Sequence, residues 1–187
     1  MQLGIITKDD GKRNVSLMVR MPSNIAFVID HCVGVSHSSR PDFVIDGIRQ
    51  FMVAISYEEA RVFEFIETKK DASREVKLQF YYESMKSFTL TFRNTIASAA
   101  EKSEKKDVDI LLSLPKGLAA QIDEFVNRTK AFKNHQEFIK CATIFLSTTM
   151  GAVNTNSMLA GTYLINNEAT KELQEQVEKM RKEMEGK

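Results

Sequence analysis

The chain has 187 residues, of which 43% are hydrophobic and 27% are charged, so it can bury the core of one ordinary domain or of two small ones. Lys and Arg number 26 against 25 Asp and Glu, and the net charge of +1 excludes a globally basic protein that coats nucleic acid, although not a local basic site. The two cysteines, Cys32 and Cys141, are too few for a disulfide scaffold. No apolar run is long enough for a transmembrane helix, and the first 20 residues lack the apolar block of a secretory signal, so we expect a cytoplasmic protein with no membrane partner.

After an N-terminal arm over residues 1–13, residues 14–53 predict one strand and two helices. Apolar and outward positions alternate as in a half-buried strand; the apolar set is Val15, Leu17, Val19 and Met21, and the outward set is Ser16, Met18 and Arg20. Pro22 ends the strand, and apolar residues at helical spacing follow until Gly34 breaks the helix. The stretch Ser39-Arg40-Pro41-Asp42 predicts the start of a second helix, with Ser39 as its N-cap and a proline in its first turn.

Residues 54–106 predict a helical connector, because no glycine or proline occurs between Gly47 and Pro115. Apolar residues in it follow the spacing of a helical seam, namely Leu78, Tyr81, Met85, Phe88, Phe92 and Ala99. Two shorter stretches, 76–82 and 88–92, alternate instead and suit strands. We favour helices with a break near residues 69–73. The many aromatic residues indicate a packed element, which either covers the core or offers a surface to a second chain or to another protein.

Residues 107–149 repeat the first unit. A shift of 93 residues lays Val15–Pro22 over Val108–Pro115, and four residues after the proline are then identical: Ala26, Ile29, Asp30 and Val33 match Ala119, Ile122, Asp123 and Val126. Two more residues in the following turn bring Ser39 onto Asn134 and Phe43 onto Phe138. The second unit therefore predicts a strand over 108–114, a helix from about 116 to 128, and a further helix behind a capping box at 134–137.

Residues 150–187 predict a polar loop followed by a helix that begins at Glu168, with Asn167 as its cap. This helix carries one apolar stripe, formed by Leu173, Val177, Met180 and Met184. A single helix of this length is marginal in isolation, so we expect it to dock on its own chain or on another protein.

Each copy resembles a ribbon-helix-helix unit, the fold of the Arc, MetJ and CopG repressors. The resemblance rests on Val15–Phe51, with its Met21-Pro22 strand exit and its Ser38–Val44 helix start, whereas Val108–Leu146 matches the hydrophobic frame but the motif less well. It implies a mainly α fold with a short antiparallel β-ribbon, in which tandem units are joined by a long helical connector. One unit is too small to fold alone, so two must pair. The copies pair within one chain as a pseudo-dimer, which we favour because the folded connector can return the chain, or copy one pairs with copy one of a second chain in a homo-oligomer.

The resemblance also implies where DNA binds. In this family a β-ribbon enters the major groove, outward strand residues read bases, and the start of the second helix holds a phosphate. Carried over, the base-reading residues are Ser16, Met18 and Arg20, and the phosphate-binding residues are Lys12, Arg13, Ser39, Arg40, Asn134 and His135. The outward positions of copy two suit base reading poorly and predict a degenerate face; they are Asp109, Leu111 and Ser113. The plain alternatives are a solvated charge for Arg20, a packing contact for Met18, and caps that only end their helices.

These residues predict a DNA-binding transcription regulator whose partner is double-stranded DNA. The alternative is a protein-interaction module, antitoxin-like or a scaffold, in which the ribbon serves dimerisation while the connector or the tail helix binds a protein partner. We expect no enzyme, because the sequence has no glycine-rich phosphate loop, nucleophile elbow or metalloprotease helix. His31, Cys32 and His37 are too few to predict a metal site, and no cofactor is expected.

Overall fold

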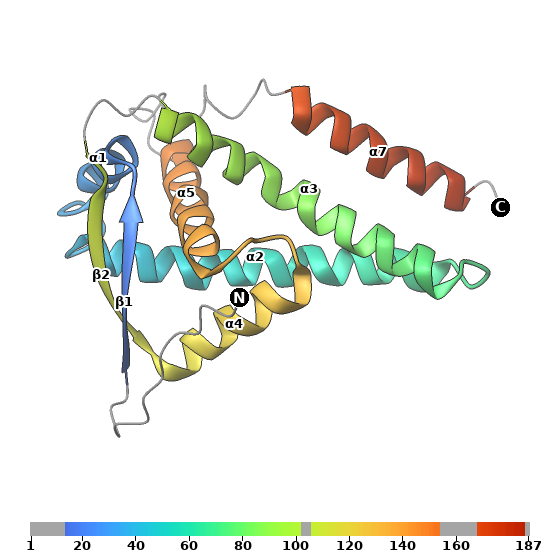
Figure 1. Ribbon diagram of the computed structural model, residues 1–187, viewed down its shortest axis with the longest axis horizontal. Helices are drawn as coiled ribbons and strands as arrows, with labels where there is room; N and C mark the ends of the chain where they lie inside the picture. The colour runs from blue at the N-terminus through green and yellow to red at the C-terminus, as the bar shows by residue number, and fades with distance from the viewer. Residues whose placement is uncertain (1–13, 102–105, 154–167, 186–187) are drawn as a thin grey trace.

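The computed structural model describes residues 14–101, 106–153 and 168–185, and it is mainly helical with one two-stranded antiparallel sheet (Figure 1). Along the chain the elements are β1 (Asn14–Met21), α1 (Ser23–Cys32), α2 (Arg40–Thr68), α3 (Arg74–Glu101), β2 (Val108–Pro115), α4 (Lys116–Thr129), α5 (His135–Val153) and α7 (Glu168–Glu185). The predicted mainly α fold with a short β-ribbon is confirmed, and so are the two strands and the helices that follow each of them.

The two predicted strands pair with each other within one chain. β1 and β2 run antiparallel over the full eight residues of each strand. Their register is symmetric, because Met18 lies opposite Leu111, the residue that the 93-residue shift lays over it. A residue of β1 and a residue of β2 are therefore counterparts in the repeat when they stand the same number of positions after, or before, Met18 and Leu111. The ribbon has a pseudo-two-fold axis through its centre, as expected for two copies that pair inside one chain.

The helices that follow the strands interlock. β1 leads into α1 at one end of the ribbon and β2 leads into α4 at the other end (Figure 1). Each second helix packs against the strand of the other copy, α2 against β2 and α5 against β1. The two second helices also meet each other closely, since a Cβ atom added to Gly47 would lie 2.9 Å from the carbonyl oxygen of Ala142. Gly47 and Ala142 are counterparts in the repeat, so this close approach lies on the pseudo-two-fold axis.

The core lies between the ribbon and the crossed helices. The inner face of the ribbon contributes six side chains that are at most 8% exposed: Val15, Val19, Met21, Ile110, Leu112 and Leu114. Phe51 on α2 is fully buried, and its ring lies 5.4–6.2 Å from five other rings, those of Phe88, Phe92, Phe132, Phe138 and Phe145. This aromatic cluster joins α2, α3 and α5, and burial of its large apolar surface is a main source of stability.

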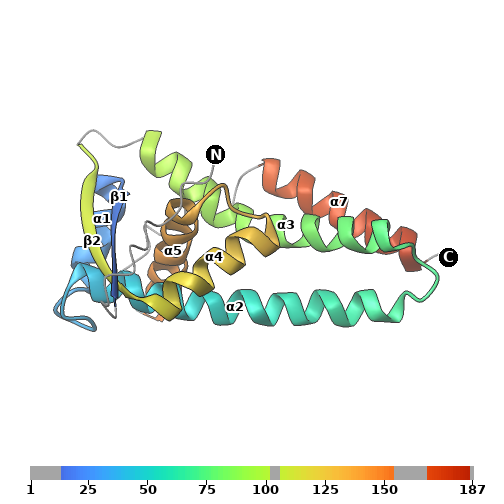
Figure 2. The same ribbon diagram turned by 60° about the horizontal axis from the view of Figure 1, so that its bottom comes forward.

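The predicted helical connector is a hairpin of two long helices. α2 ends at Thr68 and α3 begins at Arg74, which confirms the predicted break. α2 is continuous across residue 53, so the second helix of unit one and the first part of the connector form one helix. The alternation over 76–82 and 88–92 forms no strand, because the buried residues of α3, among them Tyr81 and Met85, follow helical spacing. The hairpin extends away from the ribbon, and its turn lies at the opposite end of the molecule (Figure 2).

A partly buried polar network joins α4 to the hairpin. The Tyr81 hydroxyl donates a hydrogen bond to Glu59 Oε1 at 2.5 Å, and Arg128 of α4 donates to Glu59 Oε2 at 2.8 Å. Glu59 is only 6% exposed, and a buried carboxylate is tolerated where a charge partner and hydrogen bonds satisfy it. Burial, reinforced by the hydrogen bond to Glu59, raises the pKa of Tyr81, so its hydroxyl keeps its proton and remains a donor.

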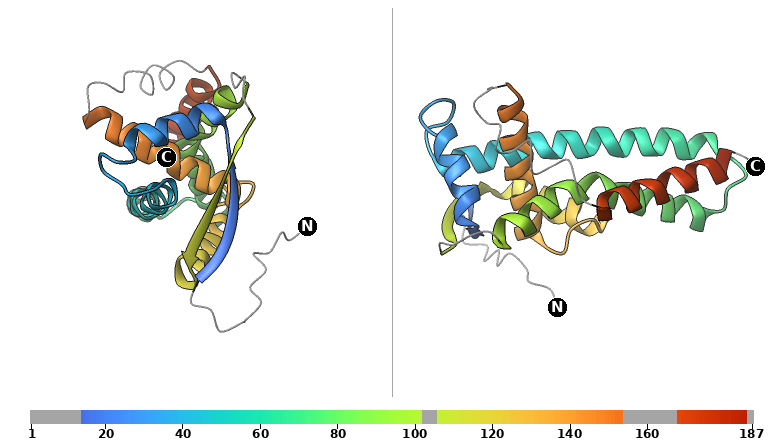
Figure 3. Two further views of the ribbon diagram at one scale, coloured as in Figure 1. Left: turned by 90° about the vertical axis from the view of Figure 1, so that its left-hand side faces the viewer. Right: turned by 90° about the horizontal axis from the view of Figure 1, so that it is seen from above.

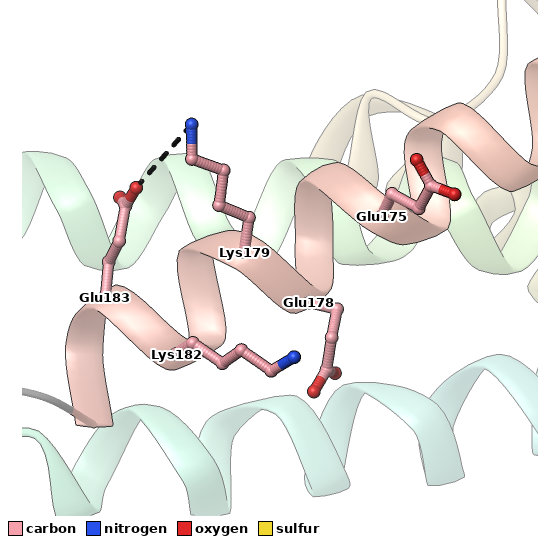
Figure 4. Close-up of a pocket in the computed structure, with 5 residues that line it drawn as sticks. All are labelled: Glu175, Glu178, Lys179, Lys182 and Glu183. Carbon is pink, nitrogen blue, oxygen red and sulfur yellow. Dashed lines mark ion pairs between the residues drawn. The ribbon is translucent and has the colours of Figure 1, made fainter.

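The C-terminal helix α7 lies along α3 (Figures 1 and 2). The predicted apolar stripe packs partly against the core through Val177, Met180 and Met184. Between Glu175 and Glu185 the remaining side chains are charged except for Gln176, and among them Lys179 and Glu183 form an ion pair at 4.0 Å (Figure 4). The predicted cap, Asn167, lies outside the described residues. None of the described helices is long and apolar enough to cross a lipid bilayer.

Candidate nucleic-acid interface

One face of the ribbon is turned to solvent. The pleat sends alternate side chains to opposite faces, and the exposed set comprises Asn14, Ser16, Met18 and Arg20 on β1 with Asp109, Leu111, Ser113 and Pro115 on β2. The two strands run side by side in the left view of Figure 3. The structure therefore brings the three predicted base-reading residues, Ser16, Met18 and Arg20, together in one accessible row, next to the outward residues of copy two.

An apolar pair occupies the centre of this outward face. Met18 is 48% exposed and Leu111 is 57% exposed, and the two lie directly opposite each other. Opposed side chains of antiparallel strands have Cβ atoms about 4.5–5.5 Å apart, so these two form one small hydrophobic patch. Such a patch can contact a thymine methyl group or an apolar side chain of a protein partner.

An ion pair between the two copies occupies one end of the outward face. Arg20 Nε lies 3.1 Å from Asp109 Oδ1, and the two side chains are 68% and 47% exposed. The hydrogen bond to Asp109, together with the charge of this carboxylate, raises the pKa of Arg20. An ion pair this exposed is weak, because water and salt screen it. The guanidinium can therefore exchange Asp109 for another acceptor at little cost.

Neutral polar groups occupy the other end of the outward face. Ser16 lies opposite Ser113, and the Asn14 side-chain amide donates a hydrogen bond to Ser113 Oγ at 3.1 Å. The predicted phosphate ligands Lys12 and Arg13 come before β1 in the sequence and lie outside the described residues. The described strand residues Asn14, Ser16 and Ser113 therefore offer uncharged hydroxyl and amide groups.

The beginning of α2 is capped by its own side chains. Ser39 Oγ accepts a hydrogen bond from the Asp42 N–H at 3.3 Å, which confirms the predicted N-cap. The hydroxyls of Ser38 and Ser39 both donate to the Asp42 carboxylate, and these hydrogen bonds lower the pKa of Asp42. Arg40 donates two hydrogen bonds to Asp30 of α1, at 2.6 and 2.7 Å. Ser39 and Arg40 thus reach a phosphate only by exchanging these internal acceptors.

The beginning of α5 has an equivalent cap. Asn134 Oδ1 accepts a hydrogen bond from the Glu137 N–H at 3.0 Å, which confirms Asn134 as the predicted cap. The Glu137 carboxylate accepts a hydrogen bond at 2.5 Å from the N–H of Lys133, one residue before the N–H that a capping box uses. The same carboxylate accepts a hydrogen bond from Arg93 of α3 at 2.9 Å. Asn134 is therefore occupied as a cap, and Glu137 connects the start of α5 to the hairpin.

The two copies share an ionic joint between their first and second helices. In copy one Arg40 pairs with Asp30, and in copy two His135 pairs with Asp123. The repeat lays Asp30 over Asp123 and Arg40 over His135, so both joints occupy the same position. The hydrogen bond from Arg40 lowers the pKa of Asp30. The joint of copy one keeps a permanent cation, whereas that of copy two is an ion pair only while the imidazole is protonated.

Gln136 is a ribbon contact that the sequence pattern did not predict. Its side-chain amide donates a hydrogen bond to the Met18 carbonyl at 2.8 Å and accepts one from the Arg20 N–H at 3.4 Å. These backbone groups lie on the edge of β1 that faces away from β2. Gln136 therefore satisfies part of a free strand edge, which would otherwise invite pairing with another strand, and it holds the start of α5 beside the ribbon. Copy one has Pro41 at the equivalent position, so the repeat carries no signal for this contact.

The histidines and cysteines form no metal site in the part of the chain that the structure describes, where no three His, Cys, Asp or Glu side chains are grouped to hold an ion. Cys32 is partly buried and Cys141 is fully buried, and both thiols are free. Burial raises the pKa of each thiol, so neither is a reactive thiolate near neutral pH.

The sequence matches no known protein family, and comparisons with curated proteins and with solved structures gave no match. The function of this chain therefore has to follow from its ribbon, its two helix starts and its hairpin.

Proposed function

We propose that this protein binds double-stranded DNA and regulates transcription by inserting the β1–β2 ribbon into the major groove. The observation that carries the proposal is the outward face of the ribbon, where two strands paired in a symmetric register expose one row of side chains each. The major groove of B-form DNA admits a two-stranded β-ribbon. Alternate side chains of both strands then meet base edges without any rearrangement of the backbone.

The residues of β1 have the chemistry to read bases. Arg20 can donate two hydrogen bonds to O6 and N7 of guanine, Ser16 can bond several bases, and Met18 can contact a thymine methyl group. All three side chains are exposed on the same face. In copy two, Leu111 can contact a methyl group and Asp109 can accept a hydrogen bond from cytosine N4. The outward side chains of copy two can therefore also contact base edges, although they depart from the pattern of the ribbon-helix-helix family.

Phosphate contacts are few, and the affinity we propose is modest. The N–H groups at the starts of α2 and α5 can hold phosphates, and Lys12 and Arg13 stand immediately before β1 in the sequence. Arg40 and His135, however, are each paired with an aspartate. With so few free cations we expect the binding constant to fall only gently with salt concentration, because the slope follows the number of phosphates neutralised.

The experiment is binding of the full chain to duplexes enriched from random DNA at physiological salt. Arg20→Ala should weaken binding to the preferred site by about 1–3 kcal/mol, which is the value of one bidentate contact to a base. Arg61→Ala is the matched control: it removes the same charge from an exposed Arg (69%) on α2, and it should leave the affinity unchanged. Equal binding of the wild type and Arg20→Ala to all duplexes would exclude base reading by this residue.

A protein-interaction module is the second candidate, and the exposed apolar side chains favour it. Besides Met18 and Leu111, the hairpin exposes Val53 (71%), Tyr57 (74%) and Phe63 (48%). In this alternative the ribbon holds the two copies together, while the hairpin or α7 binds a protein. The outward face also carries equal numbers of cations and anions among its described residues, Arg20 and Asp109, which gives DNA no net attraction.

The two candidates differ in what binds in stoichiometric amounts. The protein-interaction module predicts a partner that co-purifies at a fixed ratio, is lost on the double substitution of Val53 and Tyr57 by serine, and is retained in Arg20→Ala. If the protein binds DNA through the ribbon, Arg20→Ala should weaken DNA binding, and the double substitution of Val53 and Tyr57 by serine should leave it unchanged. A salt-sensitive shift of duplex DNA without such a partner supports the first candidate.

A further inference from the structure

The outward face of the ribbon is chemically asymmetric although its backbone is symmetric. The pseudo-two-fold axis between Met18 and Leu111 relates the two ends of the ribbon. One end carries the Arg20–Asp109 ion pair, and the other carries the hydroxyls of Ser16 and Ser113. The repeat lays Arg20 over Ser113 and Ser16 over Asp109, so both members of the ion pair correspond to serines. The face thus has a charged end, an apolar centre and a hydroxyl end.

Every copy of this protein carries the same asymmetric outward face. In a homodimer the two strands are identical, and the outward face is necessarily two-fold symmetric, which matches a palindromic site. Here both strands belong to one chain, and they pair along their whole length. The two ends of the ribbon therefore meet different base pairs with different side chains whenever the chain binds.

We infer that the DNA element covered by one ribbon is non-palindromic, with a G·C pair at the Arg20–Asp109 end and A·T pairs under Met18 and Leu111. The inference rests on the proposed DNA-binding function and assigns the chemistry of its target. Guanine presents two acceptors in the major groove and cytosine presents a donor, the N4 amino group. Arg20 is a bidentate donor and Asp109 is an acceptor, so the ion pair as a unit complements one G·C pair.

The two strands also set the orientation of that base pair. Arg20 stands on β1 and Asp109 stands directly opposite on β2. The guanine therefore lies on the side of β1 and the cytosine on the side of β2. In the reversed pair Asp109 faces the two acceptors of guanine, and Arg20 faces the amino group of cytosine. Acceptors then face acceptors on the side of β2, and donors face donors on the side of β1. The reversed C·G pair is therefore the base pair most strongly rejected at this position.

The apolar centre and the hydroxyl end of the outward face should select bases less strictly than the charged end. Met18 and Leu111 have no hydrogen-bonding group at their exposed ends, and an apolar side chain in the major groove contacts the thymine methyl group. Ser16 and Ser113 can each donate and accept, so they tolerate several bases. Sequence preference should thus be strongest at the charged end, intermediate at the centre and weakest at the hydroxyl end.

The test is enrichment of random duplexes by the full chain, followed by titration of the enriched element to establish how many chains bind it. We expect an element that lacks dyad symmetry within the stretch bound by one chain and has a G·C pair near one end. Reversal of that pair to C·G should weaken binding about tenfold or more, as for the loss of a bidentate contact. If two chains bind side by side, each should cover its own asymmetric element.

The double substitution Arg20→Asp with Asp109→Arg is the decisive variant. It keeps an opposed, exposed ion pair and the net charge, so the fold should be preserved, which thermal unfolding followed by circular dichroism checks. We expect it to prefer C·G over G·C at the same position, whereas the control Arg61→Ser should keep the wild-type preference. A dyad-symmetric element bound by one chain, or an unchanged preference in the exchanged variant, overturns the inference while DNA binding stands. Absence of enrichment by the wild type overturns the proposed function and the inference together.

Discussion

The two copies of the repeat share their apolar framework and differ at the outward positions of their strands. Phe43 and Phe138 are both fully buried at the same position, and so are Ile29 and Ile122. The outward positions of the strands, by contrast, hold Ser16, Met18 and Arg20 in copy one against Asp109, Leu111 and Ser113 in copy two. The comparison teaches that close packing restrains what lies between the copies, whereas the exposed face is free to acquire a new chemistry.

The copies also differ in what they attach to. α2 of copy one continues into the long hairpin, whereas α5 of copy two has 19 residues. Copy two is held to the hairpin through Arg128 and Glu59, and the repeat places Val35 at the equivalent position of copy one. The hairpin is thus an extension of copy one, and copy two is joined to it by a partly buried ion pair.

The largest expected difference between equivalent positions concerns Phe51 and Leu146. Phe51→Ala should lower the free energy of unfolding by about 3–5 kcal/mol, because it empties the centre of the aromatic cluster. Leu146→Ala at the equivalent position should cost less, about 2–4 kcal/mol, because a smaller side chain is removed. Urea unfolding of both variants measures the difference. Equal losses would show that the cluster is not centred on copy one.

The close approach of α2 and α5 makes a separate prediction for each of the two residues on the pseudo-two-fold axis. Gly47→Ala should destabilise the protein by about 1–3 kcal/mol, because the added Cβ would lie 2.9 Å from the backbone oxygen of Ala142. Ala142→Gly should cost about 1–2 kcal/mol, because it lowers the helix propensity and removes a fully buried methyl group. Thermal or urea unfolding gives both values. A stabilisation in Gly47→Ala, as helix propensity alone predicts, would contradict the observed contact between the helices.

The polar network that joins α4 of copy two to the hairpin can be weakened by removing one hydroxyl group while the aromatic ring is kept. Tyr81→Phe should lower the free energy of unfolding by about 1–2 kcal/mol, because Glu59 then lacks one donor while it stays buried. Tyr57→Phe removes the same hydroxyl from a residue that is 74% exposed, and it should change the stability by less than about 0.5 kcal/mol. Similar effects of both substitutions would argue against the buried network.

The smallest expected effect is the pH dependence of the ion pair between Arg40 and Asp30 in copy one. The hydrogen bond from Arg40 holds the pKa of Asp30 below its ordinary value, so the pair stabilises the fold above about pH 4 and this contribution is lost as the pH falls through the lowered pKa. Arg40→Ala should therefore cost at most about 1 kcal/mol at pH 7, because the pair is exposed and screened, and nothing once Asp30 is protonated.

Urea unfolding of the wild type and of Arg40→Ala at several pH values measures this cost. A cost that persists unchanged after Asp30 is protonated would contradict a stabilising role of the Arg40–Asp30 ion pair.

The sequence by itself determined the local elements of this protein. The alternation over residues 15–21, the proline that follows each strand and the caps at Ser39 and Asn134 all appear where they were predicted, because each depends on neighbouring residues only. The repeat also predicted that the copies are built alike. The connector could be assigned to helices because it lacks glycine and proline, in spite of the local alternation that favours strands.

Only the tertiary structure decided which groups of distant elements these helices and strands contact. The pairing of Arg20 with Asp109 and the contact of Gln136 with β1 join residues that are 89 and more positions apart, and no local pattern specifies such contacts. Likewise, nothing in the sequence around Arg40 shows that an aspartate of α1 already occupies its guanidinium. Periodicity records which side of an element is apolar, whereas the partner of an exposed charge is set by how the chain closes on itself.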